Sequence, residues 1–137
     1  MTKPELDDDV VPAVFDCFIG GYMGTSYRVH LDGEVLVHET LEQYKPTNTS
    51  RRTPSAADWT RFWAALEQVG AWGWAGPYEC PGVMDGTNWS VHIVRGPRML
   101  AARGTNGYPP LGDSSEPGPE FKAFLKATSK LAGAPFR

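Results

Sequence analysis

Residues 53–70 are the most strongly patterned segment of the chain. Large apolar side chains recur there every three or four positions, which places them on one face of an α-helix: Trp59, Phe62, Trp63, Leu66 and Val69. Thr53 is placed to cap this helix, Pro54 suits its first turn, and Gly70 ends it. Because so wide an apolar stripe must be buried, the helix is expected to pack on another layer of structure.

A second helix is expected from about residue 120 to residue 131. One of its faces is apolar and consists of Phe121, Phe124, Leu125 and Leu131. The other face carries a lysine at every fourth position, namely Lys122, Lys126 and Lys130. Gly133 and Pro135 follow and are typical of a helix end.

The rest of the patterned sequence is typical of β-strands. Residues 13–20 are apolar almost throughout, which favours a strand buried on both faces. Residues 25–31 and 88–94 alternate between apolar and polar side chains, which predicts strands with one buried face. Residues 99–103 are expected to pair back on the strand 88–94 after a turn at residues 95–98.

The Asp32-Gly33 pair predicts a hairpin turn after the strand 25–31, but two registers fit the sequence. A two-residue loop sets Leu36 and His38 beside the inward side chains of the first strand. A longer, bulged loop sets Val35 and Val37 there instead. We favour the bulged loop, because it keeps apolar side chains on one face of the hairpin.

Together these elements predict an α+β fold. We expect an antiparallel sheet of about five or six strands with two amphipathic helices packed on one face, in the order βββ-α-ββ(β)-α. The polar residues 42–52, which include Pro46, are expected to form a loop. Residues 1–12 are expected to be an irregular acidic lead-in, and residues 13–137 to form one domain.

The charge distribution bears on partners and location. The formal net charge is −3, with three basic and nine acidic side chains in residues 1–50 and ten basic and seven acidic ones in the remainder. No dense basic cluster supports nucleic-acid binding, and no apolar run is long enough to cross a membrane. The acidic N-terminus does not resemble a signal peptide, so we expect a cytoplasmic protein whose two cysteines are buried thiols rather than a disulfide. We also expect a bacterial or phage origin.

Catalytic and metal-binding patterns are weak, and no cofactor is expected. His30 and His38 could face each other diagonally across the hairpin, but the short ligand spacings of structural zinc sites are missing. The least unfavourable enzyme hypothesis is a small hydrolase that uses Cys80 as nucleophile, His92 as base and Asp85 to orient it. A third hypothesis is a small-ligand pocket between the sheet and the helix that carries Trp59 and Trp63.

The stronger signal is a set of side chains typical of protein interfaces. Tryptophan, tyrosine and arginine dominate binding hot spots, since they bury a large area with few rotatable bonds or with strong donors. Six of them lie in or beside expected loops, and we predict that they bind a partner: Trp72, Trp74, Arg95, Arg98, Arg103 and Tyr108. The sequence therefore favours a small non-catalytic binding protein, such as an inhibitor, an immunity factor or an adaptor, whose partner is another protein.

Overall fold

The computed structural model describes residues 10–21, 24–80, 86–110 and 116–137. Within these residues the strands are β1 (Val14–Gly20), β2 (Thr25–Asp32), β3 (Val35–Glu42), β4 (Lys45–Arg52), β5 (Tyr78–Glu79), β6 (Asn88–Arg95) and β7 (Arg98–Thr105). The helices are α2 (Ala56–Val69), the short 3-10 helix η1 (Ala71–Gly73) and α3 (Pro119–Ala132). All seven strands form one sheet in the order β4-β3-β2-β1-β6-β7-β5.

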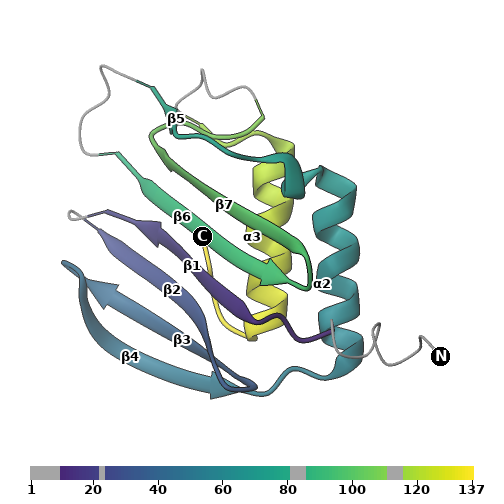
Figure 1. Cartoon of the computed structure of the whole chain (residues 1–137). Helices are drawn as coiled ribbons and strands as arrows, with labels where there is room; N and C mark the ends of the chain where they lie inside the picture. Colours follow the sequence, from purple (N-terminus) through teal and green to yellow (C-terminus); the bar gives the residue numbers. More distant parts are fainter. Residues whose placement is uncertain (1–9, 22–23, 81–85, 111–115) are drawn as a thin grey trace.

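The predicted α+β class is confirmed, and α2 and α3 cover the same face of the sheet (Figure 1). The sheet has more strands than predicted and is mixed, because β5 runs parallel to β7 while the other neighbours are antiparallel. No helix in the described part of the chain has both the length and the apolar character needed to cross a membrane.

The helix-covered face of β1 and β6 forms the centre of the core. Phe15, Cys17 and Ile19 of β1 alternate with less buried residues, and Trp89, Val91 and Ile93 do the same in β6. The prediction that β1 is buried on both faces is wrong. Val14 is exposed and Asp16 and Phe18 are half-buried, because no described element covers the second face of the sheet.

Strand β4 corrects the prediction of a loop over residues 42–52. It pairs antiparallel with β3, and all its residues are exposed because it is an edge strand. Neither face of β4 rests on the core, so its sequence needs no apolar alternation, and Pro46 is tolerated at an edge next to a register shift. The pattern that would have revealed this strand is therefore missing from the sequence.

The favoured register of the β2–β3 hairpin is also wrong. The turn consists of residues 33–34 alone, so that His38 lies opposite Val29 on the helix-covered face and Val37 points to the other face. His38 is 3% exposed, and its Nε2 is hydrogen-bonded to the carbonyl oxygen of Pro135 in the C-terminal segment. A buried histidine with a polar partner therefore occupies a position at which we expected an apolar side chain.

The N-cap of helix α2 lies two residues later in the sequence than predicted. Ser55 and not Thr53 is the N-cap, and it forms a capping box in which Ser55 Oγ accepts from the Asp58 backbone at 3.0 Å and Asp58 Oδ2 accepts from the Ser55 backbone at 2.9 Å. Gly70 ends the helix in the left-handed conformation, as predicted. Trp59 and Trp63 of the predicted apolar stripe are buried, and so is Trp89 on the predicted buried face of strand 88–94, each at most 4% exposed.

Candidate functional site

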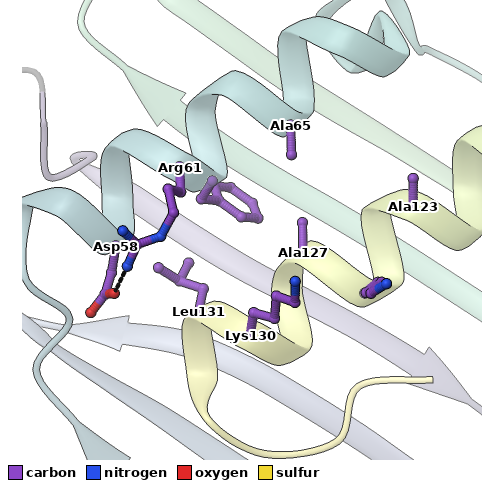
Figure 2. Close-up of a pocket in the computed structure, with 9 residues that line it drawn as sticks. Asp58, Arg61, Ala65, Ala123, Ala127, Lys130 and Leu131 are labelled. Carbon is purple, nitrogen blue, oxygen red and sulfur yellow. Dashed lines mark hydrogen bonds and ion pairs between the residues drawn. The ribbon is translucent and has the colours of Figure 1, made fainter.

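Helices α2 and α3 lie side by side on the sheet, and a groove of about 430 Å³ runs between them on their outer side (Figure 2). From α2 the groove is lined by Asp58, Arg61, Phe62 and Ala65. From α3 it is lined by Ala123, Lys126, Ala127, Lys130 and Leu131. Residues that are far apart in the sequence thus share one concave surface.

The floor of the groove is apolar. Phe62 and Leu131 are both 2% exposed and close the bottom, while three alanines form the sides above them: Ala65, Ala123 and Ala127. Alanine extends only one methyl group from the helix, so the two helices leave space between them where longer side chains would have filled it. Figure 2 shows these methyl groups pointing into the space between the helices.

One end of the groove holds a carboxylate whose negative charge is already balanced by two arginines. Asp58 accepts from Arg52 Nη2 at 3.2 Å and from Arg61 Nη2 at 2.6 Å. The hydrogen bond from the Ser55 backbone, followed by that from the Ser55 side chain and the attraction of both arginines, lowers the pKa of Asp58 below its usual value. Asp58 therefore stays ionised and adds little negative potential to the groove.

The two lysines of the groove are cations without a counter-ion among the residues that the structure describes. Lys126 and Lys130 are exposed, and no carboxylate of the described residues lies within 4.0 Å of either ammonium group. Lys122 continues the row one turn earlier on α3. The groove thus combines an apolar floor with a positive rim, which suits a ligand that is both apolar and anionic.

Three of the six predicted binding residues, Trp72, Arg95 and Arg98, gather elsewhere, around the C-terminal half of α2 and η1. The Arg98 guanidinium lies 4.4 Å from the Trp72 ring centre, and Arg95 lies 4.7 Å from that of Trp63. The two indole rings are stacked at 6.0 Å, and Arg98 forms an ion pair with Glu67. We call these five residues the arginine–tryptophan stack. Their charged groups and rings already contact one another, so fewer of them are available to a partner.

The other three predicted binding residues do not join this stack. Trp74 is 6% exposed against Phe124, and Tyr108 is 7% exposed against Phe121, so both belong to the core. Burial raises the pKa of Tyr108. Arg103 lies on the uncovered face of the sheet, opposite Ser90 of β6.

The structure separates the residues of the enzyme hypothesis. The backbone N–H of Cys80 donates to the carbonyl oxygen of Thr105 at 3.2 Å, whereas His92 pairs with Ala101, four residues earlier on β7. At about 3.3 Å per strand residue they are offset by ~13 Å along β7, and because they flank β7 on opposite sides, Cys80 and His92 are still farther apart. Asp85 lies outside the described residues.

The two weaker alternatives, a His30/His38 metal pair and a ligand pocket under α2, are likewise not assembled by the described residues. His30 and His38 lie on opposite faces of the hairpin, and the described residues contain no cluster of three potential metal ligands. The interface between the sheet and α2 is filled by Trp59, Phe62 and Leu66, each at most 2% exposed. The open space lies on the other side of α2, between the two helices.

The sequence shows the lysine row but not the groove. The row follows from the helical spacing of Lys122, Lys126 and Lys130, which by itself predicts only a polar face opposite the apolar one. The alanines carry no signal of their own, because a groove depends on how two helices pack. Comparison with known proteins adds no assignment, since no family model matches the chain and no curated protein matches it significantly.

Proposed function

We propose that this chain is a non-catalytic binding protein that docks another protein in the groove between α2 and α3. The observation that carries the proposal is a groove with accessible alanine sides next to Lys126 and Lys130, two cations without a counter-ion among the described residues. Covering these alanines removes apolar surface from water, which contributes about 25 cal/mol for each Å² buried. A partner with carboxylates also gains charge-assisted contacts that the free protein does not make.

This mode of action fits an inhibitor, an immunity factor or an adaptor, since each works by occupying a surface of another protein. The groove is lined by helices rather than by loops, so this chain loses little conformational entropy when a partner binds. The arginine–tryptophan stack supports the proposal less, because Arg98 is already engaged by Glu67 and Trp72.

Affinity purification from the native host with matched baits tests the proposal. Ala123→Trp fills the groove from an exposed position, and Ala101→Trp places the same side chain at an exposed position on the uncovered sheet face. We expect the same specific protein to be enriched by the wild type and by Ala101→Trp, and to be reduced about tenfold with Ala123→Trp, the loss of about 1.4 kcal/mol of binding free energy. Circular dichroism of each bait confirms that it is folded.

The Arg98→Glu variant tests whether the arginine–tryptophan stack is the binding surface instead, because it breaks the stack without changing a residue of the groove. If the partner is lost with Arg98→Glu and retained by Ala123→Trp, the binding surface is the stack and the proposal is wrong. Enrichment of no specific protein by any folded bait would also contradict it.

A further inference from the structure

We propose that the segment docked in this groove is an amphipathic α-helix with small apolar side chains on one face and a row of carboxylates along its edge. The inference rests on the proposed function and names the partner's chemistry. It follows from three properties of the groove, which are the lack of backbone partners along its walls, the small alanine side chains on its sides and the spacing of its lysines.

The walls favour a helix over an extended segment. Both walls are the sides of α-helices, α2 and α3, whose backbone donors and acceptors are used within each helix. An extended peptide buried between them would leave its own N–H and C=O groups unpaired, and each buried, unpaired group weakens binding. A helix satisfies these groups internally and presents only side chains to the groove.

The alanine sides of the groove favour close packing of that helix. Ala65, Ala123 and Ala127 flank the groove on both sides, so a third helix can approach α2 and α3 without being held off by long side chains. The recessed floor also argues against a membrane as occupant, since a lipid surface is entered by protruding apolar side chains rather than by a concavity.

The rim favours a negatively charged helix. Lys122, Lys126 and Lys130 are spaced by four residues, so their row extends about 12 Å along α3 at 1.5 Å per residue. Carboxylates four residues apart on a docked helix repeat at the same distance and can face the lysines one to one. Arg61 stands on the opposite wall, and its pairing with Asp58 offsets the repulsion that this carboxylate would exert on such a helix (Figure 2).

Designed peptides test this inference directly, because they reproduce the chemistry proposed for the docked segment. The first probe is a fluorescent helix of about 18 residues, roughly five turns, with alanine and leucine on one face and glutamate at every fourth position beside it. The second carries lysine in place of each glutamate, and the third scrambles the first so that its composition is kept and its amphipathic face is lost. Binding is measured by fluorescence anisotropy with the full chain at about 0.15 M salt.

We expect the acidic helix to bind at least about tenfold more tightly than the lysine peptide and the scrambled peptide. The Lys126→Glu/Lys130→Glu variant is expected to lose the acidic helix by a similar factor and to gain the lysine peptide. The control Lys45→Glu/Arg51→Glu makes the same change of net charge on β4, outside the groove, and should leave both affinities unchanged. This exchange of preference requires direct pairing between the peptide and the rim.

Four results would overturn the inference. Equal binding of the scrambled peptide shows unspecific charge attraction, and equal loss with the control variant shows that the site is not the groove. Tighter binding of anionic phosphatidylglycerol vesicles or of duplex DNA with the same dependence on Lys126 and Lys130 identifies a different class of ligand. If the acidic helix fails while Ala123→Trp still releases a natural partner, the proposed function stands and the helical, acidic character of the partner is wrong.

Discussion

At the scale of single residues, Gly104 shows how closely the chain packs around the core tryptophans. Trp89 Nε1 donates to the carbonyl oxygen of Gly107 at 2.8 Å, and a Cβ at Gly104 would lie 2.3 Å from that nitrogen and 2.4 Å from that oxygen. We predict that Gly104→Ala lowers the free energy of unfolding by about 1–3 kcal/mol, as overpacking does. Gly73→Ala is the control, since nothing lies within 4 Å of its added Cβ, and an equal loss in urea denaturation would contradict this reading.

The two cysteines should differ in reactivity. Cys17 is fully buried, and burial, with a smaller contribution from Asp16, raises the pKa of its thiol well above the usual value. Its sulfur is therefore both protonated and inaccessible at neutral pH, whereas Cys80 is only partly buried. We predict that iodoacetamide modifies Cys80 in the native protein and modifies Cys17 only after unfolding. Peptide mass spectrometry measures both, and rapid native modification of Cys17 would contradict the described core.

The lowered pKa of Asp58 predicts how the stability of the protein depends on pH. Its pKa is lowered in the folded chain, so the ionised form is favoured by folding. The resulting stabilisation is complete above the unfolded value of about 3.9 and is lost as the pH falls through the lower folded value. We predict that Asp58→Asn is less stable than the wild type at neutral pH and that this difference shrinks below about pH 4. Thermal unfolding across this range measures the effect, and a difference independent of pH would contradict the assignment.

At the scale of elements, Arg52 joins three of them. It extends from β4, donates to the carbonyl oxygens of Lys130 and Leu131 at the C-terminal end of α3 at 3.2 and 2.6 Å, and pairs with Asp58 at the start of α2. A cation placed on the last carbonyl groups of a helix is favoured by the helix dipole. The edge strand is thereby tied to both helices that form the groove.

We therefore predict that Arg52→Ala lowers the free energy of unfolding by about 1–2 kcal/mol, through loss of charge-assisted hydrogen bonds. Arg51→Ala is the matched control, because Arg51 is the neighbouring residue and forms an exposed pair with Asp32 that should contribute less than about 1 kcal/mol. Chemical denaturation of the two variants makes the comparison. Equal losses would show that the bridge does not hold the elements together.

The elements differ in how far the sequence predicts them. Helix α2 is predictable because its apolar stripe and Gly70 report directly on burial and chain reversal. Strand β4 is not, because an edge strand exposed on both sides has no buried face for its sequence to encode. The predicted β2–β3 register is wrong because His38 is buried by means of a polar contact with Pro135, a residue from the other end of the chain.

At the scale of the whole molecule, the groove is a product of packing rather than of any one segment. Lys126 and Lys130 can be recognised from spacing alone, but their apolar neighbours Ala65 and Phe62 belong to the other helix. The same limit applies to the predicted binding residues. Arg98 and Trp72 meet only because the β6–β7 hairpin folds back beside η1, and Trp74 turns into the core instead.

Site-specific photo-crosslinking in the native host is the most direct test of the groove as a binding site. A benzophenone side chain placed at Ala65 or at Ala123 reports what lies in the groove, and one at Ala101 reports what lies on the uncovered sheet face. We predict that both groove positions form an adduct with one and the same protein, mapped by mass spectrometry to one segment of it, and that Ala101 does not. An adduct from Ala101 with no adduct from either groove position would contradict the account.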